Sequence, residues 1–320
     1  MSTVRPTLLL NGKPPQAGLE LRLAESYRLH RLHEQPDADA FLSAHGAEID
    51  GIVAPAPVGA SAALIEALPN LRVIAGFGVG FDQVDQGAAL RRGVKVSNTP
   101  DVLNECVADH AFALLLDVAR GVAAGDRFVR RGDWLKGRFP LGTRVSGKKL
   151  GVLGLGRIGR AVAQRASGFG MEVGYCNRRP AGDVPYAWHG TPAELARWCD
   201  FLVITAAGGD STRHLVDRET IDALGPRGML INVARGSVID EAALIEALQE
   251  RRIAGAGLDV FEREPQVPPG LRVLDNVVLT PHIASGTEET RAAMADLVVD
   301  NLSSFFTSGR LITPVPWSPA

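Results

Sequence analysis

The sequence predicts an α/β protein made of two domains, each with a doubly wound parallel sheet. Short apolar runs alternate with helical patterns along the chain, and this alternation is typical of parallel sheets covered by helices. A chain of 320 residues is long enough for one large domain or two ordinary ones. A loop rich in Gly, "RGDWLKGRFPLGTRVSG", interrupts the alternation before it resumes, which favours two domains.

The first half of the chain contains four apolar runs that we expect to be strands. They are "TLLL" (7–10), "GIVA" (51–54), "LRVIAGFG" (71–78) and "GVKVSN" (93–98). Helical patterns separate them at 61–70 and 81–93, and a long helical segment runs from 101 to about 129. This part of the chain therefore predicts one βαβ series followed by a helix.

A second βαβ series begins after the loop. Its expected strands are "KKLGVLGLG" (148–156), "MEVGYC" (171–176), "DFLVIT" (200–205), "GMLINVA" (228–234), "GAGLDV" (255–260) and "NVVLTP" (276–281). A helix is expected at about 286–307, before a tail rich in Pro.

Composition and charge favour a small-molecule partner over a polymer or a lipid. The formal net charge of −2 creates no field that would attract nucleic acid or an anionic membrane. Cys106, Cys176 and Cys199 are odd in number and far apart, so they predict neither a disulfide framework nor a metal site. Together with the lack of a membrane-length apolar run or a signal peptide, this predicts a cytoplasmic protein.

A glycine-rich turn opens the second series. "GVLGLGRIG" places Gly154, Gly156 and Gly159 in G-x-G-x-x-G spacing between an expected strand and an expected helix. In that context the spacing is a dinucleotide-binding fingerprint: the glycines allow a tight turn, close approach of the pyrophosphate and close packing of the helix. The helix N-terminus would then face the phosphates. The competing interpretation is a turn that binds no ligand.

The residues that end the next strand indicate which dinucleotide binds. An NAD enzyme usually has a carboxylate here for the ribose hydroxyls, but this chain has Asn177, Arg178 and Arg179. Asn177 does not repel a 2′-phosphate, and the two arginines can bind it through charge-assisted hydrogen bonds. We therefore predict NADP rather than NAD. The alternative is a pair of solvated arginines.

Polar side chains follow three of the later strands. Arg235, Asp259 and His282 come directly after such strands, and Glu264 follows Asp259 closely. Ligands of an open parallel sheet bind beyond the carboxyl ends of its strands, so these groups are candidates for one site. An imidazolium can donate a proton to a ketone oxygen during hydride transfer, and a carboxylate beside it favours the charged ring. A guanidinium can bind a substrate carboxylate and polarise the carbonyl. For each of these residues considered alone, a surface side chain without a catalytic role is the simpler interpretation.

A second glycine cluster, "GFGVGFD" (76–82), ends a strand of the first series. Successive backbone N–H groups in such a cluster can form an anion-binding nest, which suits a substrate carboxylate. The alternative is an ordinary turn.

These motifs together resemble the D-isomer-specific 2-hydroxyacid dehydrogenases. The resemblance covers almost the whole chain, and it is dense from about 70 to 305. It rests on "GVGFDQVD", "NTPDVLNECVAD", the glycine-turn segment, "GMLINVARGSVIDEAALIEAL", "AGAGLDVFEREP" and "NVVLTPHIASGT". Within the family, "CNRRP" and "GLDVFEREPQVPPGL" resemble the NADPH-preferring glyoxylate, hydroxypyruvate and hydroxyphenylpyruvate reductases.

The resemblance implies a role for each matching residue. The implied catalytic residues are Arg235, Glu264 and His282, and the implied substrate-binding residues are Val79, Gly80, Arg235 and His282. The implied cofactor-binding residues are Val107, Gly154, Leu155, Gly156, Arg157, Ile158, Gly159, Asn177, Arg178, Arg179, Ala207, Val233, Ala234 and Asp259.

The resemblance also implies how the chain is organised. Residues 1–99 and 286–320 would form a flavodoxin-like substrate domain, residues 100–285 a Rossmann domain for NADP, and the cleft between them the active site. The implied protein is a homodimeric NAD(P)-dependent dehydrogenase that reduces glyoxylate or hydroxypyruvate to the D-2-hydroxy acid. It departs from its relatives at Gly208, Gly209 and Asp210, on the adenine side, and at Gly137 in the loop. A corepressor of the same fold that senses the dinucleotide with little turnover is the alternative.

Overall fold

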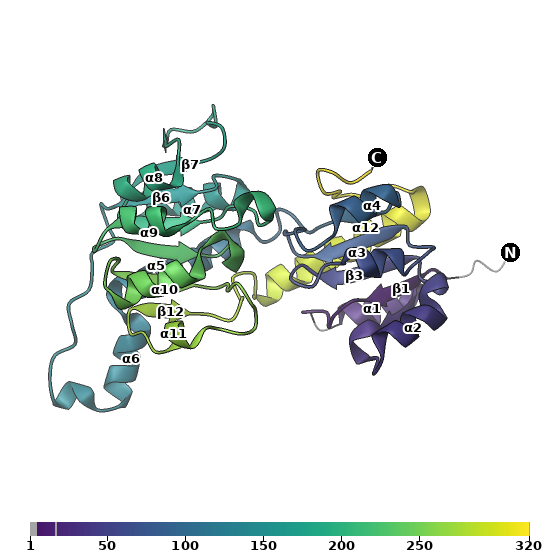
Figure 1. Cartoon of the computed structure of the whole chain (residues 1–320), viewed down its shortest axis with the longest axis horizontal. Helices are drawn as coiled ribbons and strands as arrows, with labels where there is room; N and C mark the ends of the chain where they lie inside the picture. The colour runs from purple at the N-terminus through teal and green to yellow at the C-terminus, as the bar shows by residue number, and fades with distance from the viewer. Residues whose placement is uncertain (1–4, 17, 320) are drawn as a thin grey trace. The chain divides into compact units, whose positions relative to one another are not determined.

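The computed structural model describes residues 5–16 and 18–319 of the chain. The chain divides into two compact units, Met1–Leu103 with Thr287–Ala320 and Asn104–Gly286 (Figure 1). The first unit is therefore discontinuous in sequence, and the second is inserted within it. Within the described ranges, no helix combines the length and apolar character that crossing a membrane requires.

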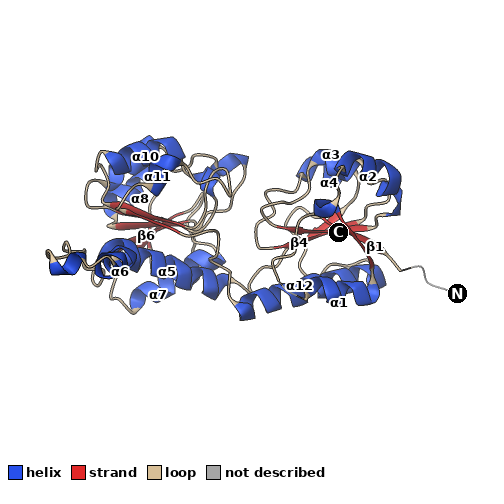
Figure 2. Cartoon of the chain, turned by 90° about the horizontal axis from the view of Figure 1, so that it is seen from below, coloured by secondary structure: helices blue, strands red, loops and turns tan. Residues whose placement is uncertain are grey.

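The first unit contains a five-stranded sheet in the order β2-β1-β3-β4-β5 with every pair parallel. The strands are β1 (Thr7–Leu10), β2 (Arg28–Arg31), β3 (Gly51–Pro55), β4 (Val73–Phe77) and β5 (Lys95–Ser97). The helices are α1 (Leu19–Ser26), α2 (Ala38–His45), α3 (Ala62–Glu66), α4 (Gln86–Arg91) and α12 (Glu288–Ser308). Helices α2, α3 and α4 cover one face of the sheet, and α1 and α12 cover the other (Figure 2). This strand order is that of a flavodoxin-like sheet.

The second unit contains a seven-stranded parallel sheet in the order β12-β11-β10-β9-β6-β7-β8. Its strands are β6 (Lys149–Leu153), β7 (Glu172–Cys176), β8 (Ala187–Trp188), β9 (Phe201–Ile204), β10 (Met229–Asn232), β11 (Gly255–Leu258) and β12 (Val277–Leu279). Its helices are α5 (Asn104–Arg120), α6 (Val122–Arg130), α7 (Arg157–Ser167), α8 (Pro192–Trp198), α9 (Arg218–Leu224), α10 (Glu241–Gln249) and α11 (Pro269–Arg272). Helices α5 and α7 lie on one face and α8 and α10 on the other (Figure 2). The order reverses between β6 and β9, as in a Rossmann sheet.

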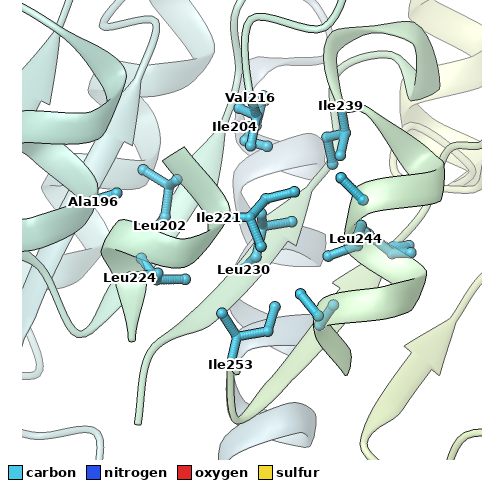
Figure 3. Packing of buried hydrophobic residues seen from close by; sticks show 14 of the residues in the cluster. Ala196, Leu202, Ile204, Val216, Ile221, Leu224, Leu230, Ile239, Leu244 and Ile253 are labelled. Carbon is cyan, nitrogen blue, oxygen red and sulfur yellow. The ribbon is translucent and has the colours of Figure 1, made fainter. Parts of the chain in front are cut away.

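Burial on both faces explains why the strands read as apolar runs. All residues of β9 and β10 are buried. Helices that pack against one face of the sheet complete this core, in which Ile221 of α9 and Leu244 of α10 join Leu230 of β10 (Figure 3). A strand covered on both sides has no solvent face on which polar residues could alternate.

Some elements differ from the sequence predictions. The expected long helical segment is two helices, α5 and α6, because Gly121 adopts a left-handed conformation with φ 64° between them. The short strands β2 and β8 were not predicted, because neither carries the apolar pattern of a buried strand. Both lie at sheet edges, where one side of the strand is open.

Seven helices of the described chain, both short and long, begin at a residue whose side chain accepts a hydrogen bond from the first turn. These N-caps are Asp37, Ser61, Asp85, Thr191, Asp217, Asp240 and Thr287. Helix α7, like α1 and α6, begins at a glycine with no side-chain hydrogen bond at its cap, in this case Gly156. Its first amide groups therefore lack the usual side-chain acceptor, which leaves them suited to an external anion.

Candidate active site

The strand order gathers most of the predicted site residues of the second unit at one edge of its sheet. Because all the strands are parallel, their carboxyl ends meet at the same edge. The neighbouring strands β10, β11 and β12 end just before Arg235, Asp259 and His282. Strands β6, β7 and β9 end just before the glycine turn, Asn177 and Ala207. The carboxyl end of the sheet therefore carries two groups of residues. The glycine turn, Asn177 and Ala207 form a cofactor edge, and Arg235, Asp259, Glu264 and His282 form a polar cluster.

His282 and Glu264 form the closest pair in the polar cluster. His282 Nδ1 lies 2.7 Å from Glu264 Oε2, and both side chains are partly buried. The second oxygen of Glu264 accepts a hydrogen bond from the Phe261 amide at 3.1 Å. A backbone amide three residues earlier in the chain thus holds the carboxylate, and the carboxylate orients the imidazole through Nδ1. Nε2 is left as the ring atom that can exchange a proton with a ligand.

Asp259 supports the chain segment that carries His282. Its side chain is fully buried at the end of β11. One oxygen accepts from the Thr280 hydroxyl at 2.7 Å and the Ile283 amide at 2.8 Å, and the other accepts from the Ala284 amide at 2.9 Å. The backbone carbonyl of Asp259 accepts from the His282 amide at 2.9 Å. Asp259 therefore contacts the segment on both sides of the histidine.

The buried charge of Asp259 is stabilised by its hydrogen bonds. Burial by itself would raise the pKa of this carboxyl, but hydrogen bonds from His110, Thr280 and two backbone amides outweigh burial and lower the pKa. His110 Nε2 lies 3.3 Å from Asp259 Oδ1 and 3.0 Å from the Thr280 hydroxyl. Neither His110 nor Thr280 was predicted from the sequence. His110 lies in the middle of a helix pattern far from the polar cluster in the chain, so only Thr280, two residues before His282, carried a local signal.

Arg235 lies in the loop after β10, which packs closely on the loop after β11. Its guanidinium donates to the Ala234 carbonyl at 2.8 Å, and its own carbonyl accepts from the Asn232 side chain at 2.9 Å. A Cβ atom added at the next residue, Gly236, would lie 1.9 Å from the Phe261 carbonyl carbon. Glycine at this position is therefore needed for the Arg235 loop to reach the Phe261–Glu264 loop.

The glycine turn has the properties that a dinucleotide pyrophosphate needs. A Cβ atom at Gly154 would lie 2.6 Å from the Ala206 amide nitrogen, and one at Gly159 would lie 2.4 Å from the Gly154 carbonyl oxygen. A Cβ atom at Gly156 would meet no atom within 4 Å. Packing within the protein therefore explains the first two glycines but not Gly156. Open space at Gly156, before the uncapped start of α7, fits the close approach of a phosphate.

The other predicted cofactor residues lie around this turn. Leu155 is buried, and its amide donates to the Asn177 side-chain oxygen at 2.7 Å. The exposed Ala207 accepts a hydrogen bond from the Thr212 hydroxyl through its carbonyl. The remaining five lie in the first turn of α7 (Arg157, Ile158), after β10 (Val233, Ala234) and on α5 (Val107). Gly208 and Gly209 lead into a 3₁₀ turn at Asp210–Thr212.

Arg178 and Arg179 differ from the other adjacent arginines of the chain. Arg92 pairs with Glu66, Arg131 with Asp133, and Arg252 with Glu250, each within 3.5 Å. By contrast, Arg178 and Arg179 are exposed, and within residues 5–16 and 18–319 their side chains form no ion pair. These two guanidinium groups are therefore available to a ligand, without a competing carboxylate to neutralise them.

Val79 and Gly80 belong to the first unit, in the loop after β4. This loop is held at two points: the Val79 carbonyl accepts from the Asn98 side chain at 2.7 Å, and the Gly78 amide donates to the Thr99 hydroxyl at 3.1 Å. The side chains of Asn98 and Thr99, which follow β5, therefore hold the loop backbone in place.

The second unit matches a family model described as D-isomer specific 2-hydroxyacid dehydrogenase, NAD binding domain, over residues 112–284. The chain belongs to this family. It is therefore an oxidoreductase with a dinucleotide-binding Rossmann domain, and the resemblance predicted from the sequence is confirmed. The two sheets also confirm the predicted pair of doubly wound parallel domains.

Individual relatives cover nearly the whole chain. Glyoxylate/hydroxypyruvate reductase A from Arabidopsis thaliana is 47% identical over 94% of this chain and 96% of its own length. Hydroxyphenylpyruvate reductase from Plectranthus scutellarioides has the same identity and coverage. The crystal structure of an NADPH-dependent glyoxylate/hydroxypyruvate reductase from Sinorhizobium meliloti, in complex with NADP and malonate, is 44% identical. It superimposes with a TM-score of 0.93 and covers 99% of this chain and 98% of that one.

The two kinds of glycine in the turn lead to opposite expectations. We expect Gly159→Ala to lower the unfolding free energy by about 1–3 kcal/mol, because its Cβ would overlap the Gly154 carbonyl. We expect Gly156→Ala to keep stability within about 0.5 kcal/mol and to weaken dinucleotide binding about tenfold, because the Cβ takes the phosphate's space. Denaturant unfolding and nucleotide titration of both variants measure these effects. The reverse pattern would contradict this interpretation of the turn.

Asp259 gives an expectation for acid stability. Because its folded-state pKa lies below the usual value, its ionised form stabilises the fold at neutral pH, and this contribution is lost as pH falls through the folded-state pKa. Asp259→Asn should cost about 1–3 kcal/mol at pH 7, since it leaves buried amides poorly paired. The difference from the unmodified protein should shrink below about pH 4. Exposed Asp275→Asn is the control. A difference independent of pH would exclude the Asp259 charge as its source.

Proposed function

We propose that this protein reduces a small 2-oxo acid, glyoxylate or hydroxypyruvate, to the D-2-hydroxy acid with NADPH. The observation that carries the proposal is the 2.7 Å contact between His282 and Glu264, at the sheet edge that also carries the glycine turn. A proton donor and a dinucleotide fingerprint at one edge suit reduction of a carbonyl. The substrates named for the Arabidopsis and Sinorhizobium relatives support the choice of oxo acid.

The side chains of the polar cluster have distinct proposed roles. NADPH, when bound, supplies the hydride. His282 donates a proton from Nε2 to the oxygen of the substrate carbonyl as negative charge develops there. Glu264 holds the ring through Nδ1 and stabilises its protonated form. Arg235 binds the substrate carboxylate and polarises the carbonyl, as a guanidinium can with two parallel hydrogen bonds.

The proposed binding of the substrate carboxylate also uses Val79 and Gly80. In the described part of the chain, the amides of these residues donate no hydrogen bond. The loop that carries them is held by Asn98 and Thr99, so the amides are fixed without being used. Two fixed and available amides suit an anion such as a carboxylate. This supports a division of labour in which residues 1–99 and 286–320 bind substrate and residues 100–285 bind NADP.

The preference for NADPH rests on Arg178 and Arg179. A 2′-phosphate adds a double negative charge that an arginine side chain binds well, and the chain has no carboxylate at Asn177 to repel it. The lack of ion pairs at both arginines, within the described residues, supports the same preference. The matching Sinorhizobium structure is of an NADPH-dependent enzyme, which adds support.

We also propose a homodimer, formed through α6 and the following loop. This segment exposes Val122, Val129, Trp134, Leu135 and Leu141, each more than half accessible to solvent. Such a concentration of exposed large apolar side chains is typical of a protein interface. Sedimentation equilibrium should give twice the 34.0 kDa chain mass, whereas a monomer would refute the dimer.

We also propose a cytoplasmic location, since the three cysteines form no disulfide.

Cofactor choice is the first test of the proposal. We expect kcat/KM with NADPH to exceed that with NADH by at least about tenfold for glyoxylate, hydroxypyruvate or phenylpyruvate, the best of which indicates the substrate class. Arg178→Ala and Arg179→Ala should each lower the NADPH value about tenfold and leave the NADH value nearly unchanged. Arg91→Ala, in an exposed pair with Glu66, is the control. Equal losses with both cofactors would refute a role for these arginines in the preference.

The proton donor is tested by two substitutions. His282→Ala should lower kcat by about 10²- to 10⁴-fold, because the oxygen loses its acid. Glu264→Gln keeps a hydrogen-bonding group but removes the negative charge beside the ring, so the pH–rate profile for reduction should change. An unchanged profile in Glu264→Gln would remove Glu264 from this role. Tight NADPH binding without turnover in the unmodified protein would favour the dinucleotide sensor instead.

A further inference from the structure

The turn that carries Arg178 and Arg179 is anchored by a buried tyrosine. Tyr175, near the end of β7, is 1% exposed, and its ring fills the core of the second unit. Its hydroxyl accepts a hydrogen bond from the Ala181 amide at 2.8 Å and donates one to the Ala181 carbonyl at 3.3 Å. A phenylalanine would fill the same space. The hydroxyl is therefore not needed for packing, and it forms hydrogen bonds with the backbone of Ala181, just beyond the two arginines.

A second anchor holds the start of the turn. Trp188 of the short strand β8 donates its indole N–H to the Asn177 carbonyl at 3.2 Å. The Asn177 side chain accepts from the Leu155 amide at 2.7 Å, which ties the turn to the glycine turn. Arg160 of α7 forms an ion pair with Asp183 at 2.9 Å on the far side of the turn, an exposed contact that contributes little. The backbone on both sides of Arg178 and Arg179 is thus hydrogen-bonded, while their guanidinium groups are exposed.

We propose that Tyr175 and Trp188 are positioning residues for cofactor choice: they hold the 177–181 turn so that Arg178 and Arg179 face the 2′-phosphate before it binds. This rests on the proposed preference for NADPH. A flexible turn would lose backbone freedom when the arginines closed on the phosphate, and this loss would weaken binding. A turn held in advance loses less. Because only the 2′-phosphate uses these arginines, the gain applies to NADPH and not to NADH.

The test measures binding of the adenosine half alone and so does not depend on catalysis. Isothermal titration of the full-length protein measures its affinity for adenosine 2′,5′-bisphosphate and for 5′-AMP. The ratio of the first affinity to the second gives the contribution of the 2′-phosphate. Tyr175→Phe removes the two hydrogen bonds between the hydroxyl and Ala181, and Trp188→Phe removes the one to the Asn177 carbonyl. Each should lower the affinity for the bisphosphate about fivefold and change that for 5′-AMP by less than about twofold. Tyr186→Phe is the matched control, since in the described chain the Tyr186 hydroxyl forms no hydrogen bond.

Each outcome decides a different point. A reduced ratio in both variants with an unchanged ratio in Tyr186→Phe supports the proposal. If the unmodified protein shows a high ratio that neither variant reduces, the positioning role is wrong and the NADPH preference stands. If both probes weaken equally in the variants, the two residues act only on stability, and the role is again wrong. If the unmodified protein binds the two probes equally, the NADPH preference itself fails. Trp188, which is 45% exposed, decides the matter if Tyr175→Phe does not fold.

Discussion

Asp259 lies fully buried at the end of β11, and its carboxylate holds the segment that carries His282. A buried charge is costly unless it is hydrogen-bonded, and this one receives bonds from a hydroxyl, two backbone amides and His110. Its acceptors are satisfied only while residues 280–284 stay in place. The position of the imidazole is therefore coupled to the stability of the buried carboxylate, and the Glu264 contact sets only its final orientation.

The resemblance implies that Asp259 binds the cofactor, and its hydrogen bonds give it a structural role as well. Both oxygens already accept hydrogen bonds from the protein. A carboxylate oxygen has more than one lone pair, so a ligand amide can still bind without displacing them. Protein and cofactor would then be linked through one group, and loss of its charge would disturb both.

The cofactor edge has the opposite character. At the polar cluster, side chains satisfy one another, whereas the cofactor edge has a helix start without a side-chain cap and two arginines that form no ion pair within residues 5–16 and 18–319. Gly156 begins α7 without a side-chain cap, and Arg178 and Arg179 are exposed on an anchored turn. Unsatisfied amides and cations at the surface can be tolerated because water replaces the missing partner. The same features would bind the pyrophosphate and the 2′-phosphate of the proposed cofactor.

The sequence by itself determined the features that depend on near neighbours. Apolar runs predicted the buried strands, glycine spacing predicted the turn after β6, and polar residues at strand ends predicted Arg235, Glu264 and His282 as candidates. The break at Gly121 and the edge strand β2 were missed, because one depends on a single backbone conformation and the other lacks an apolar pattern. Only the tertiary structure decided that β10, β11 and β12 are adjacent and that His110, on α5, reaches Asp259. Such contacts join residues far apart in the chain, and strand order and helix packing create them rather than any local pattern.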